Sequence, residues 1–111
     1  MFISFKVNQD KLIVFLEGEL DHHSAEQVRS KIDNKIQDNN EKNIILDFSK
    51  VSFMDSSGIG VVIGRYKMIT AKGGKLCVVN PASNVNKIFE LSGLFKIINR
   101  YKSISEAVNN L

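Results

Sequence analysis

Cysteine, proline and tryptophan are nearly absent from the chain, which has one cysteine, one proline and no tryptophan among 111 residues. Because Cys77 is alone, no intrachain disulfide can form, as expected of a protein in a reducing compartment. Cys77 lies in the apolar run 76–79, which favours a small buried side chain over a reactive thiol. Low-complexity tracts and internal repeats are missing as well, so the length indicates a single domain over residues 1–111.

Long hydrophobic runs are missing too. The longest, residues 12–16 and 58–64, are far shorter than the ~20 apolar residues that cross a bilayer. Residues 1–10 lack the basic segment and the long apolar core of a signal peptide. These absences predict a cytoplasmic protein that has no membrane partner.

Neither basic nor acidic residues cluster in the sequence. The 15 basic and 12 acidic residues give a formal net charge of +3, and the basic residues are spread from Lys6 to Lys102 among acidic ones. A nucleic-acid binder would instead concentrate lysines and arginines on one face, with aromatic residues between them. We therefore expect a solvated surface and no direct nucleic-acid partner.

Residues that hold metals or nucleotides are equally sparse. His22 and His23 are adjacent, so they would point in different directions on a helix, and no third histidine completes a metal site. Ile63 stands where the G-x-G-x-x-G fingerprint, begun at Gly58, needs its third glycine. The sequence thus predicts no metal ion and no cofactor.

The sequence is rich in short apolar segments. In some, apolar residues recur at every second position, as in strands; in others they recur at helical spacing. The alternation of Ile3, Phe5 and Val7 predicts a strand that forms a hairpin with residues 12–16. Buried strands are predicted at 43–48 and 75–79, and apolar residues at helical spacing mark four further segments. Strands that alternate with helices predict an α/β fold: a mixed four- to five-stranded sheet with an N-terminal β-hairpin and about four helices, which cover one face more fully than the other.

Local signals predict where these elements begin and end. Asp21 or Ser24 could cap the first helix, and Ser24 with Gln27, like Ser103 with Glu106, matches the capping box of a helix start. Pro81 is expected to open the third helix. Residues 51–53 are expected to form a short loop and residues 95–98 a short edge strand.

The stretch most suggestive of function is 52–60 (SFMDSSGIG), between a buried strand and a helix start. Ligand and partner sites of open α/β sheets favour this end of the strands, where the helix dipole also attracts negative charge. Asp55, Ser56 or Ser57 could serve there only as a helix cap, which is what these residue types do at most helix starts. The sequence leaves both interpretations open at this point.

Three glycines favour the functional interpretation. Gly58, Gly60 and Gly64 fall within the predicted helix, where each costs roughly 1 kcal/mol relative to alanine. Glycines leave a helix start bare, so that another molecule could reach Ser56 closely. Gly64 could instead allow tight packing against the sheet.

Residues 19–24 (ELDHHS) form a second polar segment between a strand and a helix. In the predicted fold, Asp21 could approach Asp55 and Ser56. A serine, a histidine and an aspartate near strand ends also raise the hypothesis of a small Ser-dependent hydrolase. Ser56 is not in a G-x-S-x-G elbow, and the chain is too small to enclose a substrate pocket, so we favour a binding protein over an enzyme.

Residues 53–58 (FMDSSG) resemble the signature of the anti-anti-sigma factors, which are STAS-domain proteins, and the resemblance covers essentially the whole chain. Its most specific blocks are 18–23 (GELDHH), 52–60 (SFMDSSGIG), 64–67 (GRYK) and 91–98 (LSGLFKII). The D-S-[ST]-G core indicates only the wider family, whereas the flanking blocks favour its sporulation type over its general-stress type. Ser24 stands where threonine is common in the family, a mild change.

The resemblance implies a phosphorylation switch. The unphosphorylated protein would bind the anti-sigma factor, which is also a serine kinase, and would thereby release a sigma factor for sporulation transcription. The kinase would phosphorylate Ser56, and a metal-dependent serine phosphatase would reverse the modification. Two aspartates match the family's acidic positions beside that serine. The expected partner-binding residues are Asp21, Asp55, Ser57, Gly58 and Gly60.

Overall fold

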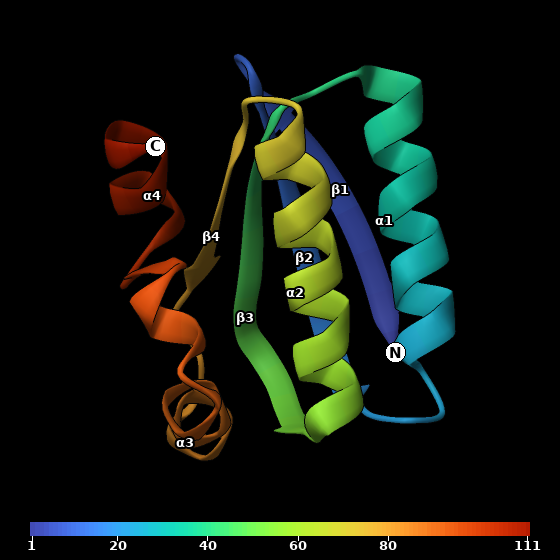
Figure 1. Ribbon diagram of the computed structural model, residues 1–111, viewed down its shortest axis with the longest axis vertical. Coiled ribbons are helices and arrows are strands. Elements are labelled where there is room, and N and C mark those ends of the chain that lie inside the picture. The colour runs from blue at the N-terminus through green and yellow to red at the C-terminus, as the bar shows by residue number, and fades with distance from the viewer.

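The computed structural model describes residues 1–111 and shows a five-stranded mixed sheet between two unequal helical layers (Figure 1). The strands lie side by side in chain order: β1 (Phe2–Asn8), β2 (Lys11–Leu20), β3 (Asn43–Met54), β4 (Lys75–Val79) and β5 (Asn99–Tyr101). The helices are α1 (Ala25–Asn39), α2 (Ser56–Ala71), α3 (Ser83–Ser92) and α4 (Ile104–Asn110), with a 3-10 turn, η1 (Leu94–Lys96), before β5. No helix is both long enough and apolar enough to span a bilayer.

The N-terminal hairpin is confirmed. β1 and β2 are antiparallel and in unbroken register, from Phe2 opposite Glu17 to Asn8 opposite Lys11. From β2 onward each neighbouring pair is parallel, because a helical segment returns the chain to the same end of the sheet each time. The predicted mixed sheet is therefore correct, and the carboxyl ends of β2 and β3 lie side by side.

The main core lies between the sheet and the layer formed by α1, α2 and α3. Alternate residues of β2, such as Leu12 and Val14, point into it and are fully buried. The intervening residues, such as Ile13, point to the opposite face, where α4 covers β3, β4 and β5. Since α4 has only seven residues, the helices cover the two faces unequally, as predicted.

β3 is longer than predicted. Residues 51–53, expected as a loop, form the last part of the strand, which ends at Met54. Two bulges in the pairing with β2 account for the difference: β3 has one extra residue between the partners of Phe15 and Glu17, and another between the partners of Gly18 and Glu19. Each bulge interrupts the apolar alternation from which a strand is recognised.

The edge strand is also placed differently. Residues 95–98 do not form it; Gly93, in the left-handed region at φ 77°, ends α3 and begins η1, and β5 follows at Asn99–Tyr101. Leu94 and Ile98 are buried. Their apolar character thus reflects a helical turn packed on the core, not a strand.

Two helix starts show how well local signals work. At α4 the predicted cap is present, because the Ser103 hydroxyl accepts a hydrogen bond from the Glu106 N–H at 3.1 Å. The third helix, α3, begins at Ser83, two residues after Pro81. Pro81 therefore ends the preceding loop and does not open the helix.

Candidate functional site

The candidate site lies where β2 and β3 end and α2 begins. Asp55 is the N-cap of α2, and one of its carboxylate oxygens accepts a hydrogen bond from the Ser57 N–H at 2.9 Å. Its other oxygen accepts from the His22 N–H, in the loop after β2, at 3.2 Å. The Asp55 N–H in turn donates to the Leu20 carbonyl at 3.4 Å. Asp55 thus joins two loops that are distant in sequence.

Ser56 is the first residue of α2 and is exposed. The Ser56 hydroxyl has no hydrogen-bond partner within the chain. The helix is capped by its neighbour Asp55, whose carboxylate accepts the hydrogen bond from the Ser57 N–H. The capping interpretation therefore applies to Asp55. It leaves the Ser56 oxygen free and accessible.

Asp21 lies in the loop that Asp55 contacts, as the sequence predicts, but its carboxylate faces its own loop. Burial raises the pKa of Asp21, yet hydrogen bonds from the Ser24 N–H at 3.2 Å and the His23 N–H at 2.9 Å outweigh it and lower the pKa. These hydrogen bonds keep the carboxylate negatively charged close to the start of α2.

The capping box predicted at Ser24 is absent. The Ser24 hydroxyl donates to the Glu19 carbonyl at 2.7 Å and accepts from the Asp21 N–H at 3.1 Å, and it makes no cap hydrogen bond with α1. Ser24 has helical backbone angles (φ −101°, ψ −16°) rather than the extended ones of a side-chain cap. Its hydroxyl closes the loop that follows β2.

The three glycines of α2 have different structural roles. A Cβ on Gly58 would lie 2.9 Å from the Leu20 carbonyl oxygen and would also overlap the Met54 side chain, so this buried glycine allows α2 to approach β2. At Gly60 and Gly64 a Cβ would meet nothing within 4 Å. Only these two leave the helix bare, and Gly64 does not pack tightly against the sheet.

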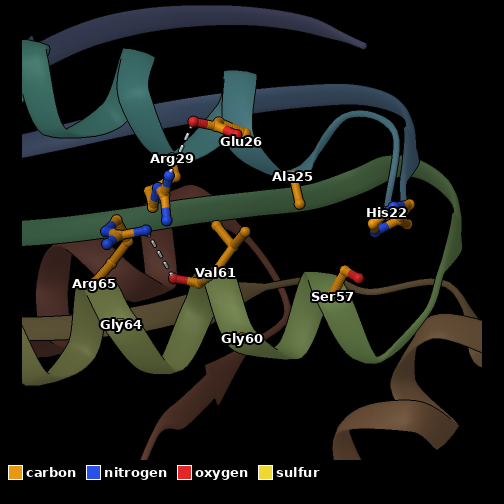
Figure 2. A pocket seen from close by; sticks show the side chains of 9 residues that line it. All are labelled: His22, Ala25, Glu26, Arg29, Ser57, Gly60, Val61, Gly64 and Arg65. Carbon is orange, nitrogen blue, oxygen red and sulfur yellow. Dashed lines mark hydrogen bonds and ion pairs between the residues drawn. The ribbon is translucent and has the colours of Figure 1, made fainter.

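Gly60 and Gly64 form the floor of a groove between α1 and α2 that the sequence did not reveal (Figure 2). Its volume is ≈ 490 Å³ and it runs from Ser57 at one end to Arg65 at the other. Ser57, Gly60 and Gly64 follow helical spacing, so they lie on one face of α2. This spacing is the one signal in the sequence that could have indicated the groove.

The far end of the groove holds two arginines. Arg65 is buried, and its Nε lies 2.8 Å from an Asp33 carboxylate oxygen, close enough for an ion pair although the N–H does not point along a hydrogen bond. Burial lowers the pKa of Arg65, Asp33 raises it, and the nearby Arg29 lowers it again. Arg29 pairs with Glu26 at 3.3 Å. Each arginine in the groove thus has its own carboxylate.

A serine hydrolase would need a base beside its nucleophile. His22 and His23 are both exposed, and neither forms a hydrogen bond with Ser56. Cys77 is fully buried, and burial raises the pKa of its thiol to about 12, so it remains protonated at neutral pH. Ser56 therefore has no neighbouring histidine to act as its base, and the buried Cys77 thiol is not exposed as a nucleophile.

The chain resembles known proteins over nearly its full length. The STAS domain family profile matches residues 2–107. An anti-sigma F factor antagonist of Paenibacillus polymyxa is 41% identical, with 98% of this chain and 93% of the relative covered. An anti-sigma-B factor antagonist of Bacillus subtilis (strain 168) is 33% identical, with 86% of each chain covered.

Solved structures that are similar to this chain also include anti-sigma factor antagonists. The anti-sigma factor antagonist SpoIIAA in its unphosphorylated form matches with a TM-score of 0.84 at 37% identity, over 97% of this chain and 94% of that one. The Bacillus cell fate determinant SpoIIAA in its phosphorylated form matches with a TM-score of 0.76 at 36% identity, over 97% of each chain. The chain therefore belongs to the STAS-domain family. Within that family its relatives are anti-sigma factor antagonists, as the sequence predicts.

Proposed function

We propose that this protein antagonises an anti-sigma factor by binding it, and that phosphorylation of Ser56 by that partner abolishes the binding. The observation that carries the proposal is the exposed Ser56 hydroxyl, free of internal hydrogen bonds at the first residue of α2. The names of the relatives support the partner class, and SpoIIAA has been solved with and without phosphate.

In the proposed reaction the Ser56 oxygen attacks the γ-phosphorus of ATP held by the kinase. The bond to the ADP oxygen breaks, ADP leaves, and the serine proton passes to a base of the kinase. A metal-dependent serine phosphatase restores the hydroxyl with water and releases inorganic phosphate. This chain contributes the acceptor oxygen alone, because Asp55 is occupied as the helix cap.

Charge explains why the phosphate would act on binding and not on folding. A phosphoserine carries about −1.5 to −2 charges at neutral pH, and the N-terminus of a helix attracts such an anion by up to ~2 kcal/mol. In a docked complex the phosphate would be desolvated near Asp21 and Asp55, at a cost of about 2–5 kcal/mol. Each ~1.4 kcal/mol is a tenfold loss of affinity, so we expect a loss of at least about tenfold.

The decisive experiment is intact-mass analysis after incubation with the cognate anti-sigma kinase and ATP, followed by peptide mapping. We expect one added phosphate on Ser56 in wild type and in Ser57→Ala, and none in Ser56→Ala, which should still bind the kinase. Ser56→Asp should weaken binding while leaving the melting temperature nearly unchanged. Phosphate mapped to Ser57, or a large loss of stability in Ser56→Asp, would contradict the proposal.

The particular sigma factor is part of the proposal. The identity of 41% to an anti-sigma F factor antagonist, against 33% to an anti-sigma-B factor antagonist, supports the sporulation type over the general-stress type. Calorimetric titration against both kinds of anti-sigma factor should therefore show tighter binding to the sporulation one. Tighter binding to the general-stress one would reverse the assignment.

We also propose that the protein is not an enzyme, since no histidine forms a hydrogen bond with Ser56. A fluorophosphonate probe, which labels activated serines, should leave the native protein unmodified. Labelling of Ser56 would favour the hydrolase hypothesis.

A further inference from the structure

The far end of the groove between α1 and α2 has more hydrogen-bond donors than acceptors. Figure 2 shows Arg29 of α1 and Arg65 of α2 together at this end. Each guanidinium group has several N–H donors and no acceptor, yet the one hydrogen bond that they make within the chain runs from Arg65 Nη1 to the Val61 carbonyl at 3.4 Å. Their ion pairs with Glu26 and Asp33 are not aligned as hydrogen bonds. Donors therefore remain available to the oxygen atoms of an anion.

The charges that line the groove also favour an anion. They belong to Arg29, Arg65 and Glu26, whereas Asp33, the carboxylate beside Arg65, is not part of the lining. The Arg65 side chain is only 9% exposed. Burial lowers the pKa of Arg65, and the like charge of Arg29 adds to this effect while Asp33 opposes it. A carboxylate bound between the two guanidinium groups would relieve their repulsion and accept their hydrogen bonds.

Glu26 holds Arg29 only loosely in the free protein. The two residues are one helical turn apart on α1, with 3.3 Å between Glu26 Oε1 and Arg29 Nη2, and their side chains are 84% and 50% exposed. Exposed ion pairs of this kind add little stability, because water screens the charges and both side chains lose freedom. Glu26 is therefore free to turn away when another carboxylate reaches Arg29.

The near end of the groove lies next to Ser56. Ser57 and Gly60, two of the expected contacts with the anti-sigma factor, line it. Arg65 follows Ser56 by nine positions on α2, which is about 13 Å along a helix. A protein interface of ordinary size covers about 800 Å² of each partner, a patch about 30 Å across. A protein that docks over Ser57 and Gly60 therefore also covers Arg29, whose charge is costly to bury without an acceptor.

We propose that the groove binds a segment of the anti-sigma factor, and that an aspartate or glutamate of this segment pairs with Arg29 and Arg65; this inference rests on the function proposed above. The bare floor admits the backbone of such a segment, since a Cβ at Gly60 or Gly64 would meet no atom of the chain within 4 Å. The incoming carboxylate displaces Glu26 from Arg29. Glu26 thus occupies, in the free protein, the position that the partner's carboxylate takes in the complex.

Two substitutions of neighbouring residues should act in opposite directions. Arg29→Gln should weaken binding of the anti-sigma factor by about 10- to 100-fold, because the partner's carboxylate loses its charged donor. Glu26→Gln should strengthen binding by about 2- to 5-fold, because the competing carboxylate is removed. Both differences should shrink at high salt. If the ion pair had only a structural role, both substitutions would change binding in the same direction.

Arg100→Gln is the matched control. The Arg100 side chain is 46% exposed and lies 3.6 Å from Glu90, so its exposure and pairing resemble those of Arg29. Arg100 belongs to β5, the edge strand farthest from β1, and does not line the groove. Its substitution should leave binding unchanged. Gly64→Ala tests the floor: its Cβ should weaken binding by about 3- to 10-fold without lowering the melting temperature.

Binding is measured by isothermal titration calorimetry, with a melting curve for each variant to verify the fold. Kinase assays add a second readout: for Arg29→Gln the KM of the kinase for this protein should rise while kcat stays constant. Wild-type affinity in a folded Arg29→Gln, or weaker binding in Glu26→Gln, overturns the inference. An equal loss in Arg100→Gln also overturns it, because the effect would then be one of overall charge.

A small soluble anion is the competing occupant. Titration of the free protein with inorganic phosphate should give no saturable heat. Saturable binding of phosphate that disappears in Arg29→Gln would assign the groove to such an anion and overturn the inference. A wild-type protein that does not bind the anti-sigma factor refutes the proposed function, and this inference with it. Normal binding by Ser56→Asp refutes the switch alone.

Discussion

Gly58 and Gly60 are two residues apart in α2, yet alanine at the two positions should shift stability in opposite directions. A Cβ at position 58 would lie 2.9 Å from the Leu20 carbonyl oxygen. That oxygen also accepts the Asp55 N–H at 3.4 Å, so it cannot move away without disturbing the junction that presents Ser56. At position 60 a Cβ would meet no atom within 4 Å.

The magnitudes follow from helix propensity and packing. Gly60→Ala should raise the free energy of unfolding by about 0.5–1 kcal/mol, because alanine restricts the unfolded chain and favours helix. In Gly58→Ala the same gain is opposed by an overpacking cost of about 1–3 kcal/mol, which leaves a net loss of about 1.25 kcal/mol at the middle of these ranges. Each 1 kcal/mol shifts Tm by about 4 °C in a domain of this size. The two variants should thus melt roughly 8 °C apart, on either side of wild type.

Thermal and urea unfolding followed by circular dichroism measure this difference. A Gly58→Ala variant that melts at or above wild type would refute the packing argument. Binding adds a second criterion, because Gly60 is a predicted contact for the anti-sigma factor. Gly60→Ala should be more stable and yet bind that partner more weakly; equal binding would remove Gly60 from the interface.

Two further predictions concern titratable groups. The pKa of Asp21 is raised by burial but lowered more by hydrogen bonds from the Ser24 and His23 N–H groups, so the carboxylate adds stability above its unfolded pKa and loses it as pH falls through its folded pKa. Asp21→Asn should therefore have a lower urea midpoint than wild type at pH 7 and the same midpoint in strong acid; a pH-independent difference would contradict this. Burial raises the pKa of the Cys77 thiol to about 12, so Ellman's reagent at pH 8 should modify Cys77 only after denaturant is added, and rapid labelling of the native protein would argue against burial.

Much of the fold could be predicted because the apolar residues follow simple periods. Val28, Ile32 and Ile36 mark the buried face of α1, and the alternation around Phe5 marks β1. The end of β3 could not be predicted in this way. Its two bulges add residues that break the period-2 pattern, and bulges depend on pairing with β2, more than 30 positions earlier in the chain.

The candidate site, too, could be predicted only where its features are local in the sequence. Ser56 and Asp55 could be identified because a helix start after a buried strand is a local feature, and their family signature is contiguous. The pairing of Arg65 with Asp33 could not be identified, because it joins two helices and depends on how they pack. The role of Gly58 was misjudged for the same reason: its Cβ would meet the Met54 side chain of β3 and the Leu20 carbonyl oxygen of β2, and Leu20 is distant in the sequence.

The contact between Asp55 and the His22 N–H has a consequence for signalling. It leaves the backbone around Ser56 little freedom to rearrange, so a phosphoryl group there would hardly deform the molecule. The active and inactive forms would then share one shape and differ in a single chemical group. Enzymes that write or erase the mark must recognise that group directly, and the response time would be limited by encounter and turnover and not by refolding.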